Sequence, residues 1–197
     1  TLTLLADLTL SDIFVINKNI TLDGNDKTLT STATRAINID TTGNVEIKDL
    51  TIVAGERAIN IINQAAVVTL NEVTATAKNN AVMIATSAGA VKLTINNSDL
   101  TGLAVVNVSG AGSEVVINNT KITNVDASTA EQYGAITVWS SAAGAKVVVN
   151  GGNITVGDDS REAYVFPADA TIEGVEDVGY IVATIGDAGF ETLEAAI

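Results

Sequence analysis

Short runs in which aliphatic and polar residues alternate dominate this chain. Six of them begin with alanine and place an aliphatic or aromatic residue directly after it or one position later. They start at Ala36, Ala58, Ala81, Ala104, Ala135 and Ala163, at intervals of 22, 23, 23, 31 and 28 residues. Alternation over a few residues rich in β-branched side chains predicts a strand. The pattern therefore predicts a strand that recurs along the whole chain.

Two further strands precede each of these runs. An aliphatic–threonine pair recurs upstream, at Leu29, Leu50, Val73, Leu100, Ile122 and Ile154. Another alternating run comes before it, starting at Ile20, Val45, Val68, Leu93, Val116 and Val148. A propeller blade needs about 40 residues and four strands, so these shorter units of three strands fit one coil of a parallel β-helix instead. We therefore expect an all-β parallel β-helix, a solenoid of about seven coils, which the crossover rule makes right-handed.

Stacking of the coils is expected to place equivalent side chains in columns along the core. One inward column contains Ile37, Ile59, Val82, Ile136 and Tyr164, and the aliphatic members of the aliphatic–threonine pairs form another. Each inward side chain is then covered by its neighbours in the coils before and after it. The longest interval contains residues 124–134, which we interpret as an insertion in a loop on one side of the solenoid.

Both ends of the chain resemble a known family. Residues 3–10 (TLLADLTL) and 20–29 (ITLDGNDKTL) resemble the opening of pectate-lyase-like β-helix repeat domains in bacterial surface, adhesin-like proteins. Residues 180–197 resemble the joint that precedes the next repeat in such proteins. The resemblance covers essentially the whole chain, and it implies the fold and a cell-surface context rather than an activity. It divides the chain into a β-helix over 1–179 and a cap or joint over 180–197.

The joint contains a short helical signal at residues 190–197. Leu193 and Ile197 are spaced i, i+4, which places them on one face of a helix that also begins near Phe190. We expect these three residues to pack on the N-terminal coil of a following module or of a second copy, because the uncovered end of a β-helix exposes a strand edge. Such end-to-end contact is open-ended and gives a stalk or filament. The alternative is that the segment folds back as a cap on its own solenoid.

Composition narrows the chemistry that this architecture could support. The chain has no His and no Cys, which excludes His-dependent triads, thiolate nucleophiles, disulfides and Cys-ligated metals. Its formal net charge of −13 disfavours nucleic acids and anionic lipid surfaces as partners. No apolar run is long enough for a transmembrane helix, and the N-terminus does not read as an intact signal peptide. We expect an extracellular or cell-surface protein that does not insert into a membrane.

Two motifs bear on enzyme chemistry. The segment Gly157-Asp158-Asp159 is similar to the paired carboxylates of polygalacturonan-cleaving β-helix glycosidases, but their further Asp, Gly-His-Gly and Arg-x-Lys motifs are missing. A lyase would need clustered carboxylates and a basic residue on a neighbouring coil. Its only arginine candidates are Arg35, Arg57 and Arg161, and Glu56 could simply pair with Arg57. We therefore expect no catalytic site.

Acidic turns are the only candidates for a bound ion. The turns at residues 23–26 and 157–159 could hold a structural calcium ion, although neither shows an established calcium-loop spacing. We interpret both primarily as ordinary turns, and we expect no metal site and no cofactor beyond that possibility.

A candidate ligand site surrounds the insertion. Trp139 follows the alternation that points outward, and Tyr133 lies in the insertion just before it. Sugar rings stack on such aromatic faces, and Asp126 and Glu131 could hydrogen-bond to sugar hydroxyls. The alternative is that Trp139 only anchors its own insertion to the coil.

The sequence thus favours a non-enzymatic structural or adhesive module of a bacterial cell-surface or secreted protein. It would associate with itself or with neighbouring modules end to end. The alternative is a carbohydrate-binding or polysaccharide-degrading β-helix protein, with glycans as partners.

Overall fold

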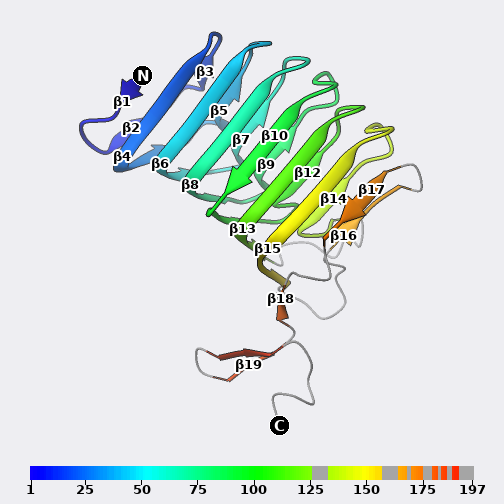
Figure 1. Ribbon diagram of the computed structural model, residues 1–197. Helices are drawn as coiled ribbons and strands as arrows, with labels where there is room; N and C mark the ends of the chain where they lie inside the picture. Colours follow the sequence, from blue (N-terminus) through cyan, green and yellow to red (C-terminus); the bar gives the residue numbers. More distant parts are fainter. Residues whose placement is uncertain are drawn as a thin grey trace.

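The chain forms stacked coils of β-strand that follow one another in sequence order from the N-terminus (Figure 1). The computed structural model describes residues 1–125, 133–156, 164–167, 170–174, 179–181, 183–185 and 188–190. All regular elements in these ranges are strands. None of the described residues belongs to a helix that is long and apolar enough to cross a membrane.

Two parallel sheets make up the solenoid. The first sheet contains β1 (Leu2–Thr3), β2 (Leu8–Leu10), β4 (Ile20–Ser31), β6 (Asn44–Ala54), β8 (Val67–Ala77), β10 (Lys92–Asn96), β11 (Asp99–Gly102), β13 (Glu114–Asn124), β15 (Lys146–Val156), β17 (Thr171–Glu173) and β18 (Gly179–Ile181). The second contains β3 (Phe14–Ile16), β5 (Arg35–Ile39), β7 (Arg57–Ile61), β9 (Asn80–Ile84), β12 (Val106–Val108), β14 (Ile136–Val138) and β16 (Tyr164–Val165). The structure therefore confirms an all-β parallel solenoid of about seven turns.

The predicted unit of three strands becomes two in most coils, because the first two strands join into one long, bent strand. β6, β8, β13 and β15 each run for 11 residues. Near the middle of this unit, five coils have a left-handed residue at the same place: Asp49 (φ 50°), Glu72 (φ 54°), Asn97 (φ 48°), Asn119 (φ 46°) and Gly151 (φ 69°). The registers place these residues at equivalent positions. In β15 the next residue, Gly152, also has a positive φ. A left-handed residue turns the strand without ending its ladder, so the corner recurs at the same place in these coils.

The first predicted core column is confirmed. Ile37, Ile59 and Val82 pair in register along β5, β7 and β9, and the column continues through Val106 and Ile136 to the backbone of Tyr164. One member of the repeat needs correction, because Val106 rather than Val105 pairs with Val82. Ala104 is therefore one position out of step with the other repeat alanines, and Val105 occupies the alanine position in that coil.

The second predicted column is wrong in two coils. Leu29 pairs with Ile52 rather than with Leu50, because the register between β4 and β6 shifts between Asp23 and Lys27. The turn residues Asn25 and Asp26, both with positive φ, cause this shift. The actual column is Leu8, Leu29, Ile52, Ala75, Leu100, Ile122 and Ile154.

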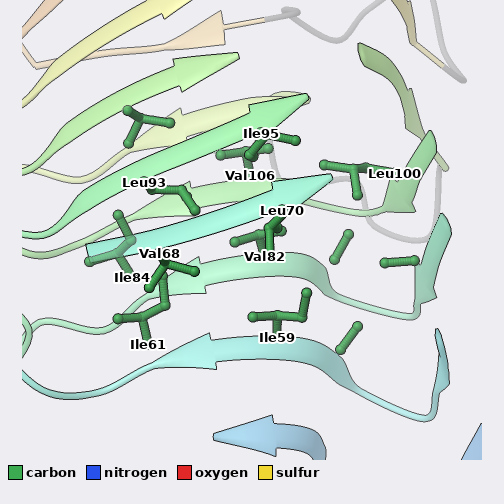
Figure 2. Packing of buried hydrophobic residues seen from close by; sticks show 14 of the residues in the cluster. Ile59, Ile61, Val68, Leu70, Val82, Ile84, Leu93, Ile95, Leu100 and Val106 are labelled. Atoms are coloured by element: carbon green, nitrogen blue, oxygen red, sulfur yellow. The ribbon is translucent and has the colours of Figure 1, made fainter. Parts of the chain in front are cut away.

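Aliphatic side chains from both sheets fill the interior. Figure 2 shows Ile59, Val82 and Val106 of the second sheet close to Leu70 and Ile95 of the first. The buried apolar core among the described residues consists of Ala, Val, Ile and Leu. The short distance across a coil explains the low aromatic content, because stacked aliphatic side chains already fill it.

An asparagine ladder, which the sequence pattern does not predict, runs along the outside of the first sheet. The Nδ2 atom of each asparagine donates to the side chain of the preceding coil, with Asn71 bonding to Glu46 and Asn96 to Asn71, and then Asn118 to Asn96 and Asn150 to Asn118. The four distances are 2.8, 2.7, 2.7 and 2.8 Å. Glu46 ends the ladder and also accepts a hydrogen bond from the Thr21 hydroxyl (3.1 Å). The ladder therefore links five successive coils through side chains.

The C-terminal segment begins in the last coil of the solenoid. β18 pairs in parallel with β15, so residues 179–181 extend the first sheet across the predicted boundary at residue 180. β19 (Ala183–Ile185) and β20 (Ala188–Phe190) form an antiparallel pair. Phe190 therefore belongs to a strand rather than to the start of a helix, and Leu193 and Ile197 lie outside the described residues.

Candidate functional site

Trp139 lies directly after β14, on the outer side of the second sheet. Its backbone N–H donates to the Val108 carbonyl (2.9 Å), and its indole Nε1 donates to Oδ1 of Asn107 (3.1 Å). Asn107 belongs to β12, so the indole reaches back over the preceding coil. The prediction that Trp139 points outward agrees with this contact, since Asn107 alternates with the inward residues Val106 and Val108.

The end of the insertion packs on this tryptophan. The rings of Tyr133 and Trp139 meet edge to face, with centroids 5.7 Å apart and planes at 76°. The next residue, Gly134, exchanges hydrogen bonds of 3.0 Å with the hydroxyl of Thr137, whose side chain is completely buried. Trp139 thus contacts its own insertion, as the anchoring interpretation requires.

A groove of about 430 Å³ nevertheless remains beside the two aromatic rings. Its lining includes Arg57, Asn80, Met83, Asn107, Tyr133 and Trp139. These residues come from four successive coils, so the groove runs along the axis of the solenoid. Its volume falls within the range of roughly 300–1,000 Å³ typical of small-molecule sites.

Two buried asparagines give the groove a fixed polar surface. Oδ1 of Asn107 accepts both the Trp139 indole N–H and the Ser109 hydroxyl (3.0 Å). Oδ1 of Asn80 accepts a hydrogen bond from Arg57 Nε (3.2 Å), and its Nδ2 donates to the Ala104 carbonyl (2.7 Å). Both asparagines are only 5% exposed. Their existing bonds hold them in place, so a ligand would meet a preformed surface.

The structure brings together only part of the predicted ligand site. Tyr133 and Trp139 meet, whereas Asp126 and Glu131 lie outside the described residues. Sequence reasoning does not find Asn80 and Asn107, and it suggests Arg57 only as a catalytic base. The signal that could have found these residues is their position in the repeat. Arg57 pairs with Asn80 across β7 and β9, and Asn107 lies on β12, one coil before β14, which Trp139 follows.

Glu56 could have paired with Arg57, but it pairs with other side chains. The Glu56 carboxylate accepts a hydrogen bond from Asn79 Nδ2 and lies 3.9 Å from Lys78 Nζ. Arg35 and Arg57 pair in register on the neighbouring strands β5 and β7. The proposed carboxylate pair Asp158–Asp159 and Arg161 lie outside the described residues.

A lysine, Lys48, forms an ion pair with the acidic turn at residues 23–26. Lys48 Nζ lies 2.8 Å from a carboxylate oxygen of both Asp23 and Asp49. The hydrogen bond from Lys48 lowers the pKa of Asp23, and the bonds to Asp23 and Asp49 raise the pKa of Lys48. Asp23 also accepts the Asn25 backbone N–H (2.9 Å). Across the described ranges, no group of three or more metal-ligating side chains comes together. A calcium ion at this turn would also compete with Lys48 for Asp23.

The first coil forms a second candidate surface. Exposed fractions are 41% for Leu2, 87% for Leu5, 39% for Leu8 and 48% for Val15. β1 and β2 pair only with β4, and β3 pairs only with β5, so this coil has a neighbour on one side within the described structure. The partner residues proposed for this end cannot be placed against it, since the side chain of Phe190 and residues 191–197 are not described.

The geometry thus presents two surfaces, an aromatic and polar groove and an apolar end. A comparison of the chain with protein-family models, curated proteins and solved structures found no match.

Proposed function

We propose that this chain is a non-enzymatic structural and adhesive module of a bacterial cell-surface or secreted protein. It would extend end to end into a stalk or filament. The observation that carries this proposal is the apolar, half-paired first coil of an otherwise regular parallel solenoid.

The first coil exposes backbone groups and apolar side chains on which another coil could stack. The outer edges of β1, β2 and β3 carry backbone N–H and C=O groups that a parallel strand can bond. Leu2, Leu5 and Leu8 lie along the same end and remain exposed. Another coil stacked there would satisfy the backbone groups and cover the leucines, as every internal coil does for its neighbours.

The body of the solenoid fits a spacer. Each coil contacts mainly its two neighbours, so the length of the rod depends on the number of coils and not on a closed core. The formal net charge of −13 favours solubility and opposes unspecific association along the sides. Association would therefore concentrate at the ends, where apolar area is exposed.

Analytical ultracentrifugation over a range of concentrations tests the assembly. The average particle mass of the wild-type chain should increase with concentration. Leu5→Asp should weaken association by about tenfold or more, since burying a charge costs several kcal/mol. Val53→Asp is the matched control, because Val53 is 43% exposed on the side of the solenoid. A monomer at all concentrations, or association that survives in Leu5→Asp but not in Val53→Asp, would contradict end-to-end assembly.

A second candidate function is glycan binding in the groove, favoured by the Tyr133–Trp139 pair above fixed amide groups. Aromatic rings take the apolar face of a sugar, and amides bond its hydroxyls. Trp139 is the only tryptophan of the chain, so its fluorescence reports directly on the groove. Binding that shifts this fluorescence in the wild type, and that isothermal titration calorimetry finds weakened at least tenfold in Trp139→Ala, would support the site, whereas unchanged affinity would remove it.

A further inference from the structure

We propose that the groove binds a sugar that carries an anionic group, and that Arg57 holds this group with support from the charge of Arg35 on the neighbouring strand. This inference rests on the second candidate function, glycan binding in the groove. It adds the chemical class of the ligand, which the aromatic pair alone does not specify.

Arg57 is positioned but not neutralised. Its Nε donates to Asn80 Oδ1 (3.2 Å), which fixes the plane of the guanidinium at the wall of the groove. Its two terminal NH₂ groups have no hydrogen-bond partner among the described residues, and Arg57 takes part in none of the ion pairs found there. Arg57 thus lines the groove while its guanidinium is held by one nitrogen and its other donors stay unpaired within the described structure.

Arg35 adds a second positive charge next to the first. It pairs in register with Arg57, which puts the two residues one strand spacing apart, about 4.8 Å. Nε of Arg35 is buried without a hydrogen-bond partner, and none of the ion pairs in the described ranges includes this residue. Two positive side chains on neighbouring strands repel each other, so an anion bound beside them would stabilise both.

Two arginines without an ion pair in the described structure are unexpected in a chain with so many acidic residues. Acidic residues number 23 against 10 basic ones, and the ion pairs within the described coils involve lysines. The nearest acidic residue in sequence, Glu56, is engaged by Asn79 and Lys78 instead. The two arginines are thus left for a charge that comes from outside the described chain.

The other walls of the groove favour a sugar ring over a bare anion. Trp139 and Tyr133 provide aromatic surface, Met83 an apolar contact, and Asn107 an amide whose Oδ1 is already occupied. Carboxylates and sulfate esters both match the fork of donors on a guanidinium. The shared chemistry is therefore an acidic or sulfated sugar, with the ring beside the aromatics and the anionic group at Arg57.

Tryptophan fluorescence titrations with three sugars test the assignment. The probes are methyl β-D-glucuronide, glucose 6-sulfate and the neutral methyl β-D-glucoside. At low salt, at least one anionic sugar should bind about tenfold more tightly than the neutral one, since a hydrogen bond to a charged group contributes about 1.5–3 kcal/mol. Which of the two binds identifies the group as carboxylate or sulfate.

Variants then locate the effect. Arg57→Gln should abolish the preference for the anionic sugar, and Arg57→Lys should retain a part of it, because the charge remains without the fork. Arg35→Gln should reduce the preference and also provides a test should Arg57→Gln fail to fold. Lys92→Gln is the control for net charge, as Lys92 is 67% exposed on the first sheet and lies outside the groove lining.

The outcomes separate this inference from the function on which it rests. Equal affinity for neutral and anionic sugars, with binding lost in Trp139→Ala by isothermal titration calorimetry, would overturn the anion assignment and leave a neutral glycan site. A preference that persists in both Arg57→Gln and Arg35→Gln would also overturn it. If none of the three sugars binds, both the anion assignment and the glycan site are contradicted.

Discussion

At the scale of single residues, the asparagine ladder shows how a side chain on the outside of the solenoid can specify register. Three of the asparagines, Asn71, Asn96 and Asn118, donate to the coil before them and accept from the coil after them. A shift of two positions in any of their strands would therefore break two bonds. The aliphatic core alone tolerates a shift of two positions more easily, because such a shift keeps the aliphatic residues of an alternating strand on the inward face.

The ladder predicts a difference between its middle and its end. Asn96 donates to Asn71 and accepts from Asn118, both at 2.7 Å, so Asn96→Ala leaves two partly buried groups unpaired. We expect a loss of about 1–3 kcal/mol in the free energy of unfolding. Asn150→Ala removes one bond at the exposed end of the ladder and should cost about 0.5–1 kcal/mol. Urea unfolding measures both, and equal losses would contradict a cooperative ladder.

The Lys48 cluster predicts a dependence on pH. Because Lys48 lowers the pKa of Asp23 in the folded state, the pair stabilises the fold above the ordinary aspartate pKa of 3.8. This contribution is lost as the pH falls below 3.8 through the lowered pKa. Asp23→Asn should therefore be less stable than the wild type at pH 7, and the difference should disappear in acid. Thermal unfolding across pH 2–7 at low salt tests this prediction. Asp12→Asn is the control, because Asp12 is exposed and lies outside the Lys48 cluster. A stability difference that persists in acid would exclude the ion pair as its cause.

At the scale of the element, the corner of each bent strand depends on a left-handed backbone. Asp, Glu and Asn occupy it in the inner coils, and two glycines, Gly151 and Gly152, occupy it in β15. Gly152 is the more constrained of the two. A Cβ atom there would lie 2.2 Å from the Thr120 carbonyl oxygen of β13, and φ is 102°.

This constraint separates two glycine substitutions. Gly152→Ala combines an unfavourable φ with a backbone clash and should cost about 3 kcal/mol or more. Gly144 also has a positive φ of 69°, but a Cβ atom there would have no heavy atom within 4 Å, so Gly144→Ala should cost about 1–2 kcal/mol. Chemical denaturation compares the two, and similar costs would show that the close approach of β13 and β15 relaxes readily.

The same elements explain which parts of the fold the sequence could predict. The alanine runs reveal the second sheet because each of its short strands carries a single pair of inward-facing residues. As a result, Ile37, Ile59 and Val82 align without gaps. The predicted first sheet is shifted by two residues at Leu50, since both Leu50 and Ile52 are aliphatic, inward-facing and followed by a β-branched residue. Alternation has a period of two, so it cannot distinguish registers that differ by two. For Leu50, the turn at Asn25 and Asp26 is what separates the two registers.

The candidate site was predictable only in its aromatic part. Tyr133 and Trp139 are recognisable because aromatic residues are rare in this chain. Arg57, Asn80 and Asn107 lie 23 and 27 residues apart in sequence, and they meet because the coils stack. Their convergence depends on the exact register of β7, β9 and β12, including the one-residue correction at Val106.

At the scale of the whole molecule, the solenoid behaves as a one-dimensional stack. Inner strands such as β7 and β9 have a hydrogen-bonded neighbour on both sides, whereas β1, β2 and β3 have one on a single side. In such a stack, local stability depends on the neighbouring coils rather than on a shared central core. The first coil should therefore open more readily than the middle, and its opening should respond to whatever covers it.

Hydrogen exchange tests both statements in one experiment. At low concentration, the amides of β1–β3 should exchange faster than those of β7 and β9, because they lack neighbours on one side. If copies stack end to end, raising the concentration should slow exchange in β1–β3 and leave β7 and β9 unchanged. Leu5→Asp should abolish this concentration dependence, and Val53→Asp should retain it. Protection in β1–β3 that is independent of concentration in the wild type would show that the exposed leucines do not recruit a second copy.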